Sequence, residues 1–293
     1  MPPLDMMPDE DYLAGVRAKW GLDNEPSTYR ANIAALVCDN QDRHFKRLTE
    51  ETRAVNIGGW AENLIESFKA SFRTHVLPDL CSVQPMTGPL GGVAFYRPHR
   101  SGREIHVHEI RAESRMCKSL VGDVSSDVAV DSLLTEVSRE ILGTLLNGVA
   151  GEDQLELAAG GQLREELEKA TNTIGQQREP ANRVVAGKKM LTQLGVVVPD
   201  DLGEGLHDLG NLDDKWDVYY DSLFPEGKLM TWYQGESILD TAIIYSPYTL
   251  VEITPNFVSP EDMTLRRALR TRHKITLVQP RLSALIRLAG TAY

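Results

Sequence analysis

The sequence has few cysteines and lacks the features of secreted and membrane proteins. Only three cysteines occur, Cys38, Cys81 and Cys117, and no two of them have a Cys-x-x-Cys spacing. A small, odd number of thiols disfavours a disulfide framework and structural zinc, and fits a reducing compartment. There is no apolar run of about 18 residues, and no basic segment followed by an apolar one at the start. The sequence therefore predicts a soluble intracellular protein with no membrane contact.

The short motifs of common enzyme classes are also missing. Neither GxGxxG nor GxxxxGK[ST] occurs, so no phosphate-binding loop is expected. No GxSxG elbow is present to carry a nucleophilic serine. The tripeptide Gly160-Gly161-Gln162 matches a peptide-release motif, but it opens an expected helix, and we interpret it as a helix boundary. These absences favour a protein without a catalytic site or cofactor.

Basic charge is scarce except at the end of the chain. The net charge is −11, which argues against a dedicated nucleic-acid binder. From Thr264 onward, however, there are seven Lys or Arg and no Asp or Glu, which leaves −18 on the rest of the chain. Such asymmetry predicts a basic strip that meets an acidic surface, either in the same fold or on a neighbouring copy. We call this the basic strip; it consists of Arg266, Arg267, Arg270, Arg272, Lys274, Arg281 and Arg287.

Two segments could hold a metal ion. His106 and His108 share one face of an expected strand, with His99 nearby, which is half of a zinc site. The acidic segment 199–217 lacks the regular ligand spacing of a calcium loop. We interpret the histidines as a solvated strand face and the acidic segment as a long exposed loop. A metal-dependent enzyme built on these residues stays open as an alternative.

The chain begins with a segment typical of an arm. Four prolines interrupt the first residues, and 28–51 has helical spacing with a thin apolar stripe. Its expected resting place is another surface, such as a neighbouring subunit. After Gly58-Gly59, a clear amphipathic helix carries Trp60, Leu64, Phe68 and Phe72 at intervals of four.

From Val83 the apolar spacing changes to every second residue. Two extended runs flank the polar tip His99-Arg100-Ser101-Gly102, which predicts a long two-stranded ribbon. An isolated hairpin is only marginally stable in water, so a long one is expected to lie on something else. The ribbon therefore indicates an intersubunit loop.

The rest of the sequence predicts an α+β fold. The strongest helix ends at Gly148 and presents the stripe Val130, Leu134, Val137, Ile141 and Leu145. Further expected elements are a helix at 162–174, strands at 183–185 and 196–198, and a short helix ending at Gln193. Strands are also expected at 218–220, 229–233, 242–245, 250–254 and 265–277.

Three groups of motifs resemble the major capsid (head) proteins of tailed bacteriophages, in particular those of T-even-like myoviruses. The first is LCSVQPMTGPLG at 80–91, followed by VAFYR at 93–97. The second is RAESR at 111–115 with LLTEVSREILGTLL at 133–146. The third comprises YYD at 219–221, YSPY at 245–248 and RTRH at 270–273. The likeness runs from about 57 to 280 in family order, although His273 stands where the family usually has Tyr.

The resemblance implies the tailed-phage major-capsid fold, which encapsulins share. It divides the chain into an N-terminal arm (1–57), a helix and approach to the extended loop (58–87), and the extended loop (88–117). A peripheral domain with the spine helix (118–174) and an axial domain (175–260) follow, then a peripheral-domain strand with a basic C-terminal tail (261–293). In such shells the arm and the loop lie across neighbouring subunits.

The implied function is self-assembly into hexamers and pentamers that form an icosahedral head around the phage DNA. Expected partners are the chain itself, other head proteins such as portal, scaffold or decoration proteins, and packaged double-stranded DNA without sequence specificity. Assembly in the host cytoplasm is expected. The candidate intersubunit contacts are Trp60, Phe68, Gln84, Met86, Phe95, Arg97, Arg103, Arg270 and Arg272.

Three further expectations concern relatives of this fold. Some related shells are cross-linked through a lysine of the extended loop. No lysine occurs from Gly88 to Cys117, so no cross-link donated by this loop is expected here. Leu48-Thr49-Glu50 and Leu64-Ile65-Glu66 loosely match a maturation-protease site, a pattern short enough to arise by chance. An encapsulin-like bacterial compartment shell is the alternative function.

Overall fold

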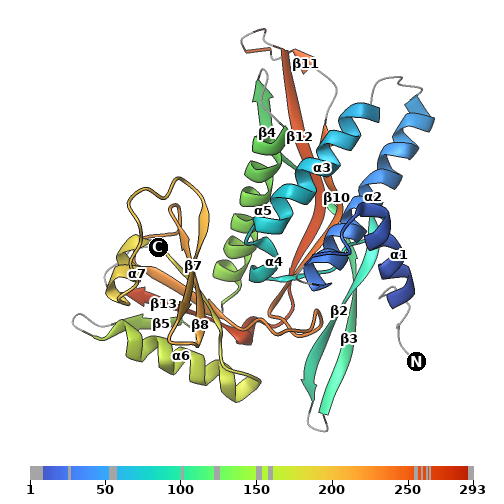
Figure 1. The fold of residues 1–293 in the computed structure, drawn as a ribbon. Coiled ribbons are helices and arrows are strands. Elements are labelled where there is room, and N and C mark those ends of the chain that lie inside the picture. Colours follow the sequence, from blue (N-terminus) through green and yellow to red (C-terminus); the bar gives the residue numbers. More distant parts are fainter. Residues whose placement is uncertain are drawn as a thin grey trace.

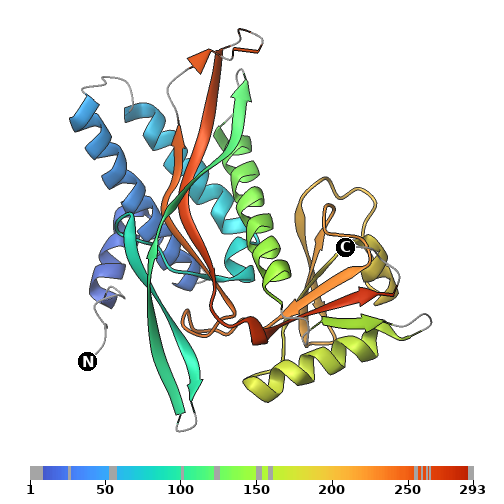
Figure 2. The same ribbon diagram turned by 180° about the vertical axis from the view of Figure 1, so that it is seen from behind.

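The protein folds into two units, each built around a β-sheet, with a hairpin projecting from the first (Figure 1). The computed structural model describes residues 9–25, 28–52, 58–99, 102–121, 126–149, 154–157, 161–253, 257–258, 260–261, 263 and 265–289. Figure 2 shows the same arrangement from behind.

The first unit contains a five-stranded sheet covered by helices on one face. In the sheet, β1 (Ser82–Val83) pairs with β10 (Ile243–Ile253), which pairs with the long β12 (Leu265–Leu277); β11 (Phe257–Val258) and β4 (Glu113–Val121) also pair with β12. All pairs are antiparallel except β1 with β10. The helices of this unit are α1 (Glu10–Trp20), α2 (Thr28–Thr52), α3 (Gly58–Thr74), α4 (Leu77–Leu80) and α5 (Ser126–Gly148).

The second unit contains a six-stranded mixed sheet in the order β5-β13-β9-β6-β8-β7. Its strands are β5 (Gln154–Leu157), β6 (Arg183–Ala186), β7 (Leu206–Leu212), β8 (Trp216–Asp221), β9 (Lys228–Trp232) and β13 (Ser283–Leu288). Helix α6 (Leu163–Gln177) packs on β13 and β9, and the short α7 (Lys188–Gln193) packs beside β6 and β8. A short 3-10 helix, η3 (Pro280–Leu282), precedes β13.

The expected spine helix is confirmed as α5. Its predicted stripe is buried along the whole helix, and Val130, Leu134, Ile141 and Leu145 have no exposed surface. Helix α5 packs between α3 and the strands β10 and β12. An apolar stripe at helical spacing is therefore satisfied by a helix that covers a sheet and is itself covered by another helix.

The expected ribbon is confirmed as the hairpin of β2 (Leu90–His99) and β3 (Gly102–Arg111). The strands are antiparallel and in continuous register from Leu90 opposite Arg111 to His99 opposite Gly102. Its far end projects beyond the body of the first unit (Figures 1 and 2). The hairpin reaches outward at one end of the first unit, and the far ends of β4 and β12 project at the other (Figure 1).

The N-terminal segment packs on its own chain, so the expected placement on a neighbour is wrong for residues 28–45. The apolar side chains of α2, such as Ile33 and Val37, are buried in the main core. The phenol oxygen of Tyr29 accepts a hydrogen bond from the amide of Val83 at 3.1 Å. Arg30 forms an ion pair with Asp79. A helix that the sequence did not predict, α1, packs beside α2, and Asp9 caps its N-terminus.

Several strand predictions need correction. The segment 196–198 forms no strand, and 242–253 contains one strand, β10, in place of two short ones. The acidic segment expected as a loop contains β7, which turns into β8 through Asp213 and Asp214, both with left-handed backbones. The expected C-terminal tail contains β13, which pairs between β5 and β9. Strands β10 and β13 form because distant strands pair with them, whereas β7 pairs with β8, the next strand along the chain.

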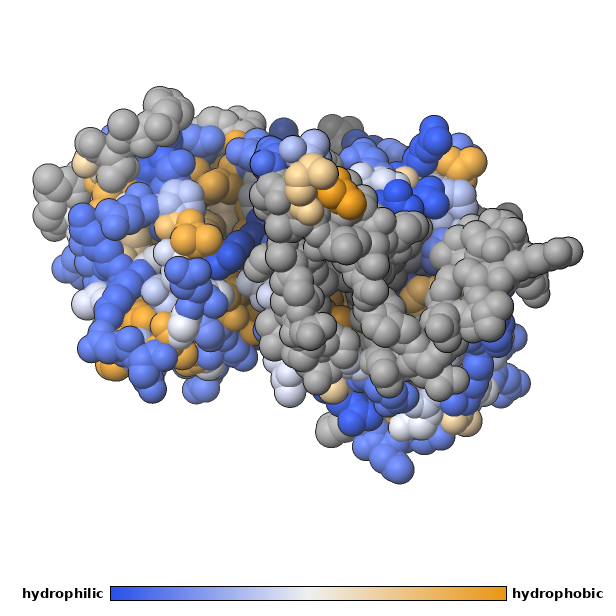
Figure 3. All heavy atoms as spheres, turned by 90° about the horizontal axis from the view of Figure 1, so that it is seen from above, coloured by the Kyte–Doolittle hydropathy of each residue, from blue (hydrophilic) through white to orange (hydrophobic). Residues whose placement is uncertain are grey.

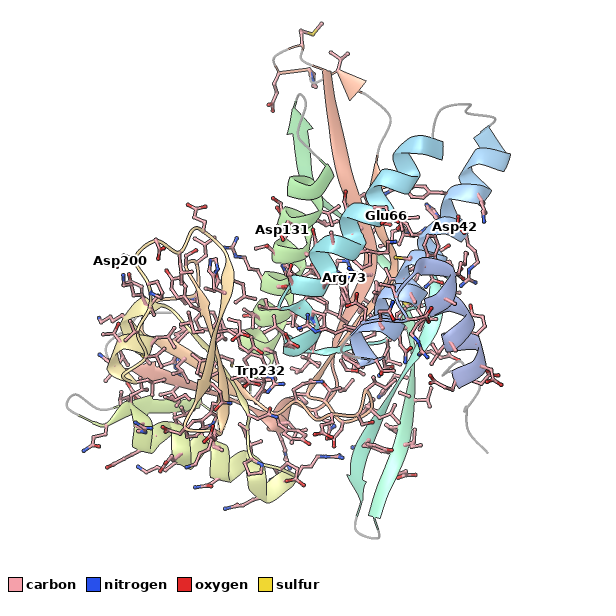
Figure 4. The ribbon with its side chains drawn as sticks, in the orientation of Figure 1. Asp42, Glu66, Arg73, Asp131, Asp200 and Trp232 are labelled. Carbon is pink, nitrogen blue, oxygen red and sulfur yellow. The ribbon has the colours of Figure 1, made fainter. Side chains whose placement is uncertain are left out.

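Buried polar contacts join the two units. The indole nitrogen of Trp232 donates to the carbonyl of Leu80 at 2.9 Å, and Trp232 lies where the units meet (Figure 4). Arg139 of α5 pairs with the buried Asp221 of β8 at 3.2 Å. Buried apolar residues of both sheets belong to one continuous core. The units are therefore packed together rather than merely tethered.

None of the helices in the described part of the chain combines the length and apolar character that a bilayer crossing requires. Viewed from above, the described surface is mainly hydrophilic, with small apolar patches over the second unit on the left (Figure 3).

Candidate assembly interface

The candidate interface is centred on the hairpin β2–β3 and on the residues that fix its base. Met86, just before β2, is buried against Ala112 and Tyr248. Its amide donates to Pro247 at 2.8 Å, and its carbonyl accepts from the side chain of Asn40 at 2.8 Å. Met86 therefore anchors the hairpin to β10 and α2 of its own chain, and the expectation of an intersubunit contact at this side chain is corrected.

Gln84 likewise has an internal role. Its side-chain amide bonds both backbone groups of Ala94, at 2.8 and 3.0 Å, and the carbonyl of Ile238 at 3.0 Å. The polar atoms of Gln84 are thus satisfied within the subunit, and its expected place among the intersubunit contacts stays a prediction.

One face of the hairpin is occupied by aromatic rings and a guanidinium. Phe95 is buried, stacks on His108 at 5.3 Å and meets His106 edge-on at 5.7 Å. The Arg97 guanidinium lies 3.5 Å from the Nε2 atom of His106, and Arg97 remains exposed. Phe95 is therefore packed by its own hairpin, whereas Arg97 is available at the surface.

The opposite face of the hairpin carries an exposed apolar strip. Leu90 is 70% exposed, Ile105 44% and Val107 37%, and Tyr96 is half-buried beside them. The register places all four side chains on the same face, since Tyr96 lies opposite Ile105 and Leu90 lies opposite Arg111. We call Leu90, Tyr96, Ile105 and Val107 the apolar strip. Grouped exposed apolar side chains of this kind mark interaction surfaces.

The basic strip is partly neutralised within the chain. Lys274 pairs with Glu113 of β4 at 2.5 Å. Its neighbour His273 is buried and lies 3.2 Å from Glu140 of α5. Arg272 is half-buried, with its guanidinium 5.2 Å from the ring centroid of Tyr248. Arg270 is half-buried opposite Glu252 in the sheet. The acidic partners of Lys274 and His273 therefore belong to the same chain and not to a neighbouring copy.

The remaining candidate intersubunit contacts are either buried in the core or have side chains outside the described structure. Phe68 is 3% exposed and packs on Phe72 with ring centroids 5.0 Å apart, so it is a core residue and not a surface contact. The side chains of Trp60 and Arg103 lie outside the described structure, and their roles stay predictions. Arg266 and Arg267 of the basic strip lie outside it in the same way.

The two candidate metal segments are far from forming one site. The rings of His106 and His108 are 5.2 Å apart, and both contact the ring of Phe95 on β2. Asp200 of the acidic segment lies on the outer side of the second unit, where it pairs with Lys188 (Figure 4). Within the described ranges, no three His, Cys, Asp or Glu side chains are grouped as metal ligands.

Sequence reasoning missed the loop at 234–241, which lies against the hairpin. The amide of Tyr96 donates to the carbonyl of Leu239 at 2.7 Å. Gly235 and Asp240 close this loop, with the Gly235 amide donating to the Asp240 carbonyl at 2.8 Å. The only sequence signal was the turn composition QGESILD at 234–240, which predicts a turn but not its partner.

Comparison with known sequence families gives one match. The sequence model of the family described as major capsid protein Gp23 matches residues 123–287, more than half of the chain. The matched region includes α5, the strands β10, β11 and β12 of the first sheet, and nearly all of the six-stranded sheet. No curated protein sequence matches this chain.

Comparison with solved structures shows that this chain shares its fold with the protein of a virus-like particle. The virus-like particle from Pyrococcus furiosus is similar with a TM-score of 0.54 and 10% identity, covering 77% of this chain and 96% of that one. A structure from Microbacterium phage Oxtober96 has a TM-score of 0.49 and 11% identity, covering 72% and 90%. The SrpI encapsulin from Synechococcus elongatus has a TM-score of 0.45 and 10% identity, covering 74% and 90%.

Proposed function

This chain belongs to the Gp23 family of major capsid proteins, and from that premise we propose that it forms the hexamers and pentamers of an icosahedral tailed-phage head. It is a structural protein that assembles with copies of itself into the capsid of the virion. The number of subunits per ring, the contact surface and the other partners are parts of this proposal.

The proposed contact is the hairpin β2–β3 laid across a neighbouring copy through the apolar strip. The exposure of Leu90, Ile105 and Val107 supports this, because these side chains gain most by leaving water. The hairpin projects beyond its own body, so a second copy can reach the strip without displacing α1 or α2 (Figure 1). In a ring each copy gives its strip to one neighbour and receives the strip of the other.

The chain is proposed to act without a catalytic site, cofactor or metal. Its acidic body supports only non-specific contact with packaged DNA, since a surface rich in Asp and Glu attracts phosphate weakly. Portal, scaffold and decoration proteins are proposed partners, and the host cytoplasm is the proposed place of assembly. The encapsulin-like alternative predicts particles that hold protein cargo, so extraction of DNA from purified particles separates the two.

The test is the assembly of the full chain with a charged apolar strip. The variant Ile105→Asp with Val107→Asp places two carboxylates where apolar contact is proposed; Ile105→Val with Val107→Ile is the matched control. Wild type and control are expected to form closed shells in negative-stain images, whereas the Asp variant stays as folded subunits by size-exclusion chromatography and circular dichroism. Shells of normal diameter from the Asp variant would show that this face is not the contact.

A further inference from the structure

The loop 234–241 joins the hairpin to the six-stranded sheet. On the sheet side, Asn182 at the start of β6 bonds both backbone groups of Gln234, at 2.8 and 2.9 Å. On the hairpin side, the carbonyl of Leu239 accepts from the Tyr96 amide at 2.7 Å, and the carbonyl of Ile238 accepts from Gln84 at 3.0 Å. A movement of either structure is therefore transmitted to the other through this short loop.

A buried ion pair holds the loop to helix α6. Arg178, directly after the helix, approaches Asp240 with two nitrogens, Nε to Oδ1 at 2.6 Å and Nη2 to Oδ2 at 2.6 Å. The two side chains are only 5% and 8% exposed. The Tyr233 hydroxyl lies 3.3 Å from the same carboxylate, and burial raises the pKa of Tyr233. Only the Nη2–Oδ2 contact has hydrogen-bond geometry, and the Nε–Oδ1 contact is a close ion-pair approach. Together they hold the guanidinium against the carboxylate.

The same guanidinium also contacts the hairpin. Its central carbon lies 5.5 Å from the ring centroid of Tyr96, a cation–π distance. Tyr96 is the residue whose amide bonds the loop. Arg178 thus touches both the loop and the hairpin from the end of a helix that packs on the six-stranded sheet.

We propose that Arg178 is a positioning residue for assembly, which holds the hairpin at a fixed angle to the six-stranded sheet through Asp240 and Tyr96 and thereby fixes the diameter of the shell. The inference rests on the proposed function, because the angle matters only if the hairpin reaches a neighbour. A ten-residue hairpin spans about 30 Å, so a rotation of about 6° at its base moves its tip by about 3 Å. Packed interfaces do not tolerate such shifts, so the angle sets the relation between neighbouring subunits.

The double variant Arg178→Met with Asp240→Leu separates positioning from stability. Removing one partner alone would leave a buried charge unpaired, which is strongly destabilising. Replacing both with apolar side chains of similar size is often neutral for stability but removes the directional contact. The matched control is Arg164→Met with Asp213→Asn, which removes a more exposed ion pair between the same helix and the β7–β8 turn.

A second variant disturbs the contact between Arg178 and Asp240 without removing either charge. A Cβ added at Gly235 would lie 2.8 Å from the Cβ and the carbonyl oxygen of Asp240, so Gly235→Ala must displace Asp240. The substitution leaves the side chains of both Arg178 and Asp240 in place in the sequence. The two variants therefore test the geometry and the charge pair independently.

The experiment combines hydrogen exchange of unassembled subunits with electron microscopy of shells formed by the full chain. We expect the double variant to melt near the wild-type temperature. We expect both it and Gly235→Ala to exchange the Tyr96 amide at least about tenfold faster and to give shells of mixed diameter. The control is expected to match wild type in melting temperature, in exchange of the Tyr96 amide and in shell diameter. Wild-type exchange at Tyr96, or uniform shells from both variants, would overturn the proposal. Failure of wild type itself to form shells would overturn the proposed function, and the exchange rates would still decide whether Arg178 holds the hairpin.

Discussion

The side chain of Gln84 bonds the backbone of Ala94 as a residue of a neighbouring strand would. Its Nε2 atom donates to the Ala94 carbonyl at 2.8 Å, and its Oε1 atom accepts from the Ala94 amide at 3.0 Å. The open backbone edge of β2 is therefore closed at the base of the hairpin. An unpaired edge invites association with other strands, so this amide also protects the subunit from the wrong partner.

We expect Gln84→Glu to destabilise the subunit by about 2 kcal/mol and to open the hairpin base. A carboxylate has no N–H for the carbonyls of Ala94 and Ile238, and it would place acceptor atoms opposite acceptor atoms. Chemical unfolding of unassembled subunits measures the loss, with Gln176→Glu on the exposed side of α6 as the control. Equal unfolding midpoints for Gln84→Glu and the control would contradict this role.

The elements that the sequence predicts well are those whose pattern is local. Helix α5 could be predicted because its stripe from Val130 to Leu145 faces one continuous core. The hairpin could be predicted because two alternating runs flank one polar tip, and its register from Leu90 to Gly102 follows from that turn. In both cases the neighbours that decide the structure lie close in the sequence.

The elements that the sequence predicts poorly have a composition typical of another structure or depend on distant partners. Strand β7 has the Gly and Asp composition of a loop and becomes a strand because β8 pairs with it. Strand β13 was expected as a tail because nothing near Ser283 in the sequence shows that β9 accepts its hydrogen bonds. Phe68 and Gln84 were expected at a subunit contact because spacing reveals an apolar or polar face but not which surface covers it.

The thiols of Cys38 and Cys81 are expected to be unreactive in the native protein. Both are buried, and burial raises the pKa of Cys38 to about 12 and also raises the pKa of Cys81. The thiolate is the reactive form, so neither group should react with a thiol reagent at neutral pH. In a Cys117→Ser variant, titration with a chromogenic disulfide should find no thiol before denaturation and both after it. Rapid native reaction would show that the core opens easily.

Assembled shells are expected to contain no covalent cross-link that starts from the hairpin. An amide bond between side chains needs an amine nucleophile, and residues 88–117 contain Arg but no Lys. The guanidinium stays protonated and is a poor nucleophile. Mass spectrometry of purified shells should therefore find only linear peptides from this stretch. A branched peptide that includes any of these residues would contradict the expectation.

Acid is expected to destabilise the junction of α3 and α5 through His75. Burial lowers the pKa of His75 from 6.5 to about 4. The Nδ1 atom accepts a hydrogen bond from the Leu77 amide at 3.1 Å, which requires the neutral ring, and Nε2 lies 3.4 Å from the Thr135 hydroxyl. Since the unfolded chain binds a proton more readily than the folded one, stability is present near neutral pH and is lost as the pH falls below the unfolded value. From about pH 7.5 to about pH 5 wild type should lose about 2 kcal/mol of unfolding free energy relative to His75→Gln. Guanidinium unfolding of unassembled subunits at both pH values measures this, and parallel losses in the two proteins would show that folding does not lower the pKa of His75.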